Sequence, residues 1–209
     1  MKVEADLIKA RSQEGGVDLV TFGLGQQKYA LPIEPIRQII EMITITPVPQ
    51  VQEFIEGVIN FHGMPVPVVN LRHQLSLPRM QLQLHTPIIL VTIANRLIGL
   101  IVDEVLDVIN LSASQIVPPE SVMPVEVGDI PVVHGLIQLE GETILYLDTN
   151  HLFAPREVRQ ISAATEAFAK DSADKIEQKP GSNGKRATKG ARAIVSERNS
   201  DQNEELGQA

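Results

Sequence analysis

Cysteine and tryptophan are absent from this chain of 209 residues, and aromatic residues make up only 3% of it. The lack of cysteine excludes disulfide bonds, thiolate zinc sites and a cysteine nucleophile. So few aromatic rings leave almost no platform on which nucleic-acid bases could stack. Long apolar runs are also missing: the run that begins at Pro87 is broken by Asn95-Arg96, well short of the roughly 18 residues that a membrane helix needs.

Charge is divided unevenly along the chain. Residues 1–154 contain 8 Lys/Arg and 17 Asp/Glu, a net charge of −9, whereas residues 155–209 contain 10 and 9, a net charge of +1. The acidic part should repel phosphate backbones, so we do not expect it to bind nucleic acid. The N-terminal residues carry acids where a signal peptide would be apolar, and we therefore predict a soluble, cytoplasmic protein without membrane insertion.

Short β-strands are predicted from about Val17 to Phe153, where apolar residues alternate with polar or small ones. The stretch GVINFHGMPVPVVNLR, residues 57–72, predicts a hairpin that turns at His62-Gly63. Pro65 and Pro67 lie two residues apart in its second strand, so both missing N–H donors fall on one edge, which we expect to be unpaired.

One helix is predicted inside this β-rich region. After Pro35, isoleucines follow one another at the spacing i, i+3, i+4 and i+7, which is typical of one or two turns of amphipathic helix. These residues are Ile36, Ile39, Ile40 and Ile43. We expect this helix to lie on a sheet.

The second half of the chain repeats the first. A shift of 69 residues aligns residues 19–40 with 88–109, and a shift of 78 aligns residues 57–70 with 135–148. The difference of nine residues places one insertion between Ser112 and Val132. Each copy is therefore predicted to be a small barrel-like unit of about five strands.

The chain divides into a flexible N-terminal segment (1–16), a folded domain (17–154) and a C-terminal tail (155–209). To about residue 178 the tail has a helical composition, but its apolar stripe is poor, so we expect marginal helicity. The rest should be disordered. Its basic run from Lys179 to Arg192 could contact nucleic acid or an anionic membrane surface, but a solvated, linker-like tail is the favoured interpretation.

Patterns of catalytic or ligand-binding residues are weak. Gly23-Leu24-Gly25 lacks the third glycine of a dinucleotide loop, and the spacing of the five histidines does not fit a zinc site. Asp103, Glu104 and Asp107 could hold a divalent cation, but a solvated acidic rim is the favoured interpretation. We therefore predict no catalytic residue, no cofactor, no metal and no small-molecule substrate, and a function that depends on docking to other proteins.

Four segments stand in a characteristic order: YALPIEPIRQII (29–40), GVINFHGMPVPVVNLR (57–72), RLIGLIVDEVLDVINL (96–111) and HGLIQLEGETILYLD (134–148). Together they resemble the CheW-like family of chemotaxis coupling proteins, and the resemblance covers roughly residues 17–153. It implies an all-β fold of two intertwined five-stranded SH3-like barrels with short helices around a shared apolar core. It also implies a non-catalytic adaptor in cytoplasmic receptor arrays at the inner membrane face.

The partners implied by this resemblance are the cytoplasmic tip of a methyl-accepting chemoreceptor and the regulatory domain of a chemotaxis histidine kinase, itself a related pair of barrels. Other CheW-like proteins are further candidates. The receptor-facing groove of the family would fall on Ile36, Gln38, Ile39, Gly57, His62, Gly63, Val102 and Val105. Among these, the isoleucines could equally belong to the core and the glycines could serve backbone geometry, whereas His62 at a loop tip is the best candidate for direct contact.

Three positions depart from the family pattern. Gln38, His62 and Asn70 stand where family members commonly have Glu, Arg and Asp. Loss of an always-charged arginine would alter partner choice, and the departures suggest a divergent system that controls pilus-driven or light-directed movement. Asn70 could instead cap a turn. The alternative function is a protein whose basic tail contacts nucleic acid or membrane while the barrels serve as a docking module.

Overall fold

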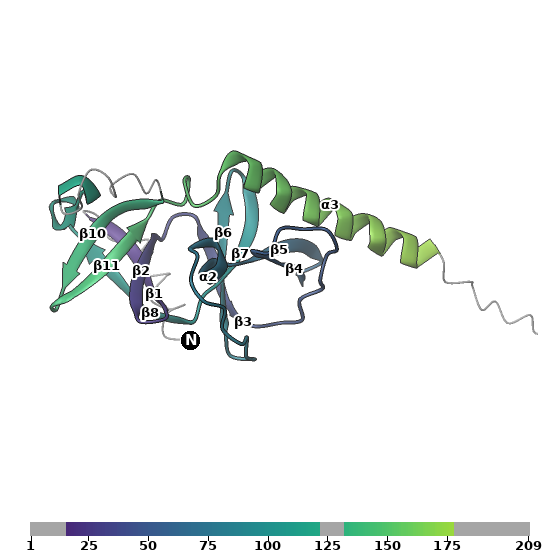
Figure 1. The fold of residues 1–209 in the computed structure, drawn as a ribbon, viewed down its shortest axis with the longest axis horizontal. Coiled ribbons are helices and arrows are strands. Elements are labelled where there is room, and N and C mark those ends of the chain that lie inside the picture. The colour runs from purple at the N-terminus through teal and green to yellow at the C-terminus, as the bar shows by residue number, and fades with distance from the viewer. Residues whose placement is uncertain (1–15, 122–131, 178–209) are drawn as a thin grey trace, which may run out of the picture.

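The computed structural model describes residues 16–121 and 132–177, which form two β-sheets and a long C-terminal helix (Figure 1). The first sheet has the strand order β8-β1-β2-β11-β10-β9 and the second β3-β6-β7-β5-β4. The first comprises β1 (Val17–Leu24), β2 (Gln27–Pro32), β8 (Glu104–Leu111), β9 (Ile116–Val117), β10 (Val133–Leu139) and β11 (Glu142–Leu147). The second comprises β3 (Ile36–Glu41), β4 (Ile55–Phe61), β5 (Met64–Asn70), β6 (Pro87–Ile93) and β7 (Arg96–Ile101).

Short helices connect some of these strands. They are α2 (Leu71–Gln74), η1 (Ala113–Gln115) and η2 (Pro119–Ser121), and α3 (Pro155–Glu177) follows the last strand. The mostly β fold of two small barrels is the predicted one. The predicted N-terminal segment, apart from Gly16, and the basic run of the tail lie outside the described residues.

The internal duplication is confirmed by the pairing of the strands. Strands β8, β1, β2, β11 and β10 of one sheet correspond in order to β3, β6, β7, β5 and β4 of the other. Leu19 faces Pro32 across β1–β2, and 69 residues later Ile88 faces Ile101 across β6–β7. The hairpin β1–β2 begins the first copy but lies in the sheet that contains β8, β10 and β11 of the second copy. The hairpin β6–β7 begins the second copy but lies in the sheet that contains β3, β4 and β5 of the first. The two barrels are therefore intertwined, and they lie side by side in Figure 1.

The predicted helix after Pro35 is wrong, because Ile36–Glu41 is the strand β3, paired antiparallel with β6. A β-bulge between Ile36 and Gln38 explains the misleading pattern. A bulge adds one residue to a strand and so shifts the alternation of faces by one. Apolar residues then recur at a spacing of three and imitate a helical stripe.

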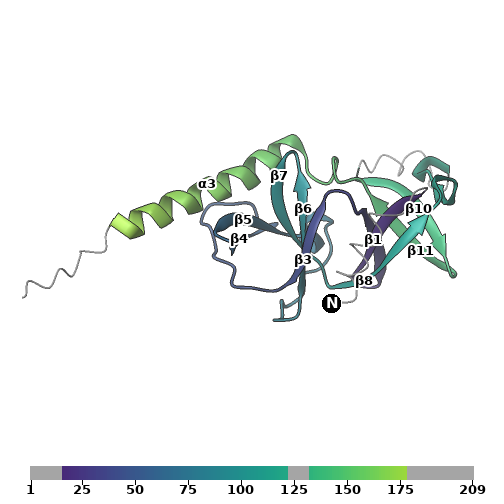
Figure 2. The ribbon, with the colours of Figure 1, turned by 180° about the vertical axis from the view of Figure 1, so that it is seen from behind.

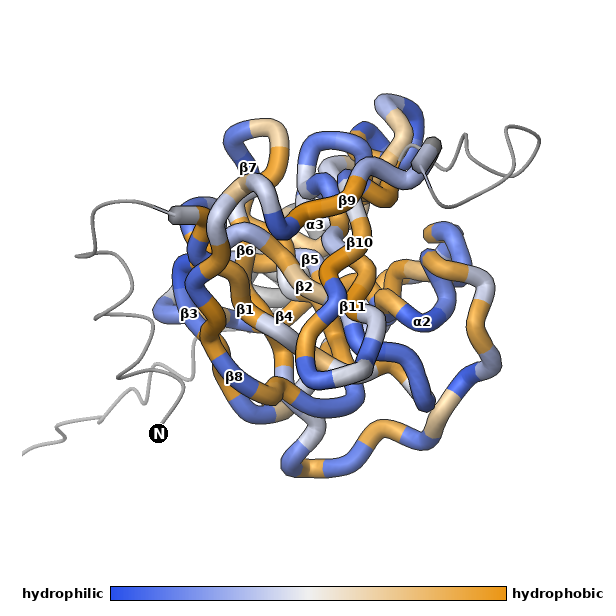
Figure 3. Tube along the Cα trace, turned by 90° about the vertical axis from the view of Figure 1, so that its left-hand side faces the viewer, coloured by the Kyte–Doolittle hydropathy of each residue, from blue (hydrophilic) through white to orange (hydrophobic). Residues whose placement is uncertain are grey.

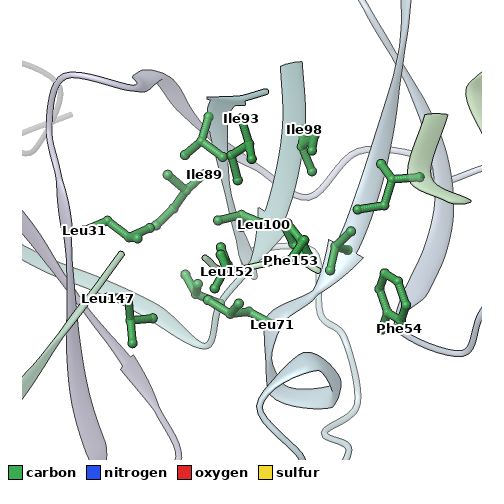
Figure 4. Packing of buried hydrophobic residues seen from close by; sticks show 14 of the residues in the cluster. Leu31, Phe54, Leu71, Ile89, Ile93, Ile98, Leu100, Leu147, Leu152 and Phe153 are labelled. Carbon is green, nitrogen blue, oxygen red and sulfur yellow. The ribbon is translucent and has the colours of Figure 1, made fainter. Parts of the chain in front are cut away.

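Three apolar clusters form the core. One lies inside each barrel, around Ile59 and Ile88 in one case and Leu19 and Ile137 in the other. The third and largest joins the two barrels. Figure 4 shows part of this shared core, with Leu31 and Leu147 from one sheet near Ile89 and Leu100 from the other. Figure 3 shows hydrophilic segments interrupting hydrophobic ones along β8, where the polar residues Glu104, Asp107 and Asn110 are each separated by two apolar residues.

The hairpin β4–β5 turns at His62-Gly63 as predicted, and both residues have positive φ angles of 50° and 84°. Phe61 and Met64 close a two-residue turn, so the ring nitrogens of Pro65 and Pro67 point away from β4 and toward β7. Parallel pairing with β7 begins only at Val68. The predicted unpaired edge of β5 is therefore found at Pro65 and Pro67, whereas the rest of that edge, from Val68 onwards, is paired with β7.

The helix α3 runs along β5 and β4 and extends past them, as the two opposite views in Figures 1 and 2 show. Ile161 and Ala164 are buried in the shared core, and Val158 and Phe168 pack against it. These contacts give the helix the tertiary support that its sequence pattern did not indicate. None of the helices among the described residues has the length and apolar character needed to cross a membrane.

Candidate docking site

Five of the residues expected in a receptor groove lie at the junction between the barrels. Ile36 and Val102 are buried in the shared core with 1% of each residue exposed, and Ile39 and Val105 are half-buried against it. Ile36 and Val105 occupy equivalent bulge positions of the two copies, opposite Val91 and Phe22. The apolar residues that can touch a partner here are therefore Ile39 on β3 and Val105 on β8, with half-buried Gln38 next to Ile39.

The other three expected residues lie on the β4–β5 hairpin. A Cβ on Gly57 would lie 2.3 Å from the carbonyl oxygen of Thr46, and the φ angle of Gly57 is 150°, so glycine is required there by the backbone. Gly63 has open space around it, and its N–H donates to Asn60 Oδ1 over 2.8 Å. These glycines shape the hairpin that carries His62.

His62 is the expected contact residue that presents an exposed side chain at a turn. Its side chain is exposed, and its ring meets that of Phe61 edge-on with 4.3 Å between centroids. No side-chain hydrogen bond or ion pair of His62 is found among the described residues. The ring is therefore held mainly by Phe61, which leaves its nitrogens available to a partner.

An ion pair that the sequence did not indicate ties the two barrels together. Arg72, in α2 after β5, donates from Nε and Nη2 to the two carboxylate oxygens of Asp103, each over 2.6 Å. The backbone N–H of Gly25, in the β1–β2 turn of the other sheet, also donates to Asp103 over 2.6 Å. The side chains of Arg72 and Asp103 are only 14% and 16% exposed. Asp103 is therefore part of a bridge, not of a solvated acidic rim, whereas Glu104 and Asp107 are exposed.

Burial of Asp103 by itself raises the pKa of its carboxyl group, but the hydrogen bonds from Arg72 and Gly25 and the charge of Arg72 outweigh it and lower that pKa below its ordinary value. The hydrogen bond to Asp103 likewise raises the pKa of the Arg72 guanidinium. The pair is therefore charged at neutral pH and fixes α2 against both sheets.

Asn70 caps the short helix α2. Its Oδ1 accepts from the backbone N–H of Arg72 over 3.1 Å, and its Nδ2 donates to Glu56 Oε1 over 2.9 Å. Asn70 is buried, so an aspartate there would set two carboxylates against each other. Glu56 is therefore a physical reason for an amide, and not a carboxylate, at position 70 of this chain. In the second copy, Asp148 accepts equivalently from the N–H of Asn150 over 2.8 Å.

Ligand chemistry has little support in the described part of the chain. No group of three or more His, Asp or Glu side chains there is arranged to hold a metal ion. The described surface instead offers partly exposed apolar residues at the barrel junction and a hairpin tip, both of which suit protein docking.

Comparison with known proteins gives one consistent result. The model of the CheW-like domain matches residues 18–157. Chemotaxis protein CheW of Thermotoga maritima is 29% identical over 160 residues, which cover 77% of this chain and 99% of that protein. Chemotaxis protein CheW of Bacillus subtilis is 31% identical over 137 residues, 65% of this chain and 85% of that protein.

A solved structure agrees with the sequence comparisons. The crystal structure of scaffolding protein TtCheW from Thermoanaerobacter tengcongensis has a TM-score of 0.61 and 30% identity, and the match covers 68% of this chain and 95% of that one. The match of the domain model over most of the chain, the duplicated barrels and this structural likeness agree, and the chain belongs to the CheW-like family.

Proposed function

We propose that this protein is a non-catalytic adaptor that couples a chemoreceptor to the regulatory domain of a chemotaxis histidine kinase in a cytoplasmic signalling array. Membership of the CheW-like family is the observation that carries this proposal. The pair of intertwined barrels also supports it, because a rigid body with separate docking faces can hold two partners in a defined geometry. The bridge from Arg72 through Asp103 to Gly25 makes that body stiffer.

The receptor contact is proposed at the barrel junction and the β4–β5 hairpin. Gln38, Ile39, Val105 and His62 would touch the receptor tip, because their side chains are exposed or half-buried. The remaining four residues of the expected groove would support this surface from behind or shape its backbone; they are Ile36, Gly57, Gly63 and Val102.

Copurification with the kinase and receptor encoded beside this gene tests the proposal. We expect the tagged chain to retain both partners. His62→Glu should lower receptor retention about ten-fold, in the range expected for a residue that matters at an interface, and should leave the fold intact. His85→Glu changes another exposed histidine in the same way and should have no effect. Retention of neither partner by the unmodified chain would refute the adaptor function.

We further propose that the system is a divergent one that controls pilus-driven or light-directed movement. The support is that Gln38 and His62 lack the fixed charges common in the family, so the receptor tip must present a different surface. Deletion of the gene should then abolish twitching or light-directed movement. Loss of flagellar swimming alone would contradict this part of the proposal.

A further inference from the structure

The helix α3 is held by apolar contacts on the barrel that contains β4 and β5. Ile161 and Ala164 are buried, with Val158 and Phe168 beside them, and the helix lies on β5 and β4. Among the described side chains, no hydrogen bond or ion pair joins α3 beyond Glu157 to either barrel. The hydroxyls of Ser162 and Thr165 bond to carbonyls of α3 itself. Apolar contact is non-directional, so another helix with a similar stripe can replace this one.

The surface of β4 and β5 on which α3 lies is called the seat of α3, and the fit of the helix to this seat is incomplete. A pocket of about 190 Å³ lies between Pro65 and Pro67 of β5 and Ile161, Ser162 and Thr165 of α3. An engineered apolar cavity of roughly 150 Å³ binds benzene, so this pocket has room for a large apolar side chain. The small polar residues Ser162 and Thr165 do not fill it.

The internal duplication shows where the pocket comes from. In the second copy, Thr143 and Leu145 stand where the first has Pro65 and Pro67, and β11 pairs with β2 from Ile144 onwards. By the same alignment, β5 of the first copy would pair with β7 from Val66 onwards, but this pairing begins only at Val68. Gln27 Nε2 also closes the second-copy edge by donating to the Thr143 carbonyl over 2.9 Å. The two prolines therefore open an edge that the other barrel keeps closed.

We propose that this seat on β4 and β5 is a docking site for an amphipathic helix of a partner protein, and that α3 is its resident competitor. The partner helix carries large apolar residues at i, i+3, i+7 and i+10. In α3 these positions are Val158, Ile161, Thr165 and Phe168, of which only Thr165 is not apolar. A helix with leucine at that third position fills the pocket and displaces α3. The family domain model ends at residue 157, so the seat lies within the matched region while most of α3 lies beyond it.

Fluorescence anisotropy with labelled peptides and the full chain tests this proposal. The peptides span residues 155–177 and carry the natural sequence, Thr165→Leu or Ala163→Leu. Ala163 is exposed, so the last peptide is a control of equal size and hydrophobicity. We expect the Thr165→Leu peptide to bind at least about ten-fold more tightly than the other two. Its addition should speed hydrogen exchange in α3 while the strands stay protected.

Two variants of the chain complete the test. Ile161→Asp should release α3 and tighten binding of the natural peptide about ten-fold or more, with strand protection as the check that the barrels remain folded. Thr165→Leu in the chain should weaken binding of the Thr165→Leu peptide about ten-fold, since the resident helix then fills the pocket. Equal affinity for the Thr165→Leu and Ala163→Leu peptides, or unchanged exchange in α3, would overturn the proposal. Dimers that exchange α3 would overturn it too, by assigning the seat to a second copy.

Discussion

Replacing Asp103 with asparagine should destabilise the fold substantially, because it leaves the Arg72 guanidinium without its counter-charge. Breaking a fully buried ion pair costs about 3–5 kcal/mol, and an exposed pair contributes less than about 1 kcal/mol. The two side chains keep 14% and 16% exposure, so we expect a loss of about 2–3 kcal/mol. For a domain of this size the midpoint of thermal unfolding should fall by about 5–10 °C.

The destabilisation caused by Asp103→Asn should depend on pH. The pKa of Asp103 is lowered in the folded state, so its contribution to stability is complete above its unfolded pKa of about 4 and is lost as the pH falls through the lower folded pKa. The difference in free energy of unfolding between the natural chain and Asp103→Asn should therefore be constant from about pH 8 to 5 and shrink below about pH 4.

Urea unfolding at several pH values is the assay, and Glu104→Gln is the control, because Glu104 is the exposed neighbour of Asp103. The control should change stability by less than about 0.5 kcal/mol. The bridge would not have the importance inferred for it if both substitutions cost the same. The same conclusion would follow if the Asp103→Asn difference persisted at the lowest pH at which both proteins stay folded.

Three further tests by substitution probe the backbone, the cap and the seat of α3. Gly57→Ala should cost about 3 kcal/mol or more in urea unfolding and Gly63→Ala only about 1–2 kcal/mol, because both have positive φ but only Gly57 also meets a backbone carbonyl; equal costs would contradict this. Asn70→Asp should lower stability at pH 7 by about 1–3 kcal/mol, and Glu56→Gln in the same chain should restore it; failure of that rescue would refute the proposed repulsion. Thr165→Leu should raise stability by about 1 kcal/mol in thermal unfolding, and a loss would show that the pocket cannot hold the side chain.

Much of the fold could be predicted because its signals are local. The turn at His62-Gly63 follows from a glycine between two alternating runs, and the duplication follows from matched apolar positions. The strand β3 was missed for an equally local reason, since its bulge between Ile36 and Gln38 breaks the alternation of period two. One extra residue in a short strand is enough to change the apparent periodicity.

The bridge and the helix seat could not be predicted because they depend on tertiary pairing. Arg72 and Asp103 are 31 residues apart and meet because β5 and β7 pair in parallel and end at the same edge. Nothing in the sequence around Asp103 distinguishes it from its exposed neighbour Glu104. The stripe of α3 looked poor because its third position, Thr165, faces a pocket instead of a filled surface.

The prolines of the first copy make the two ends of this duplicated protein chemically different. With the same residues in both copies, both barrels would have the same closed edge and would offer partners equivalent surfaces. Pro65 and Pro67 remove two N–H donors from one of these edges only, and α3 covers the edge that results. The adaptor function proposed above requires two faces that its partners can distinguish. The loss of two hydrogen-bond donors in one strand is one such difference between the two faces.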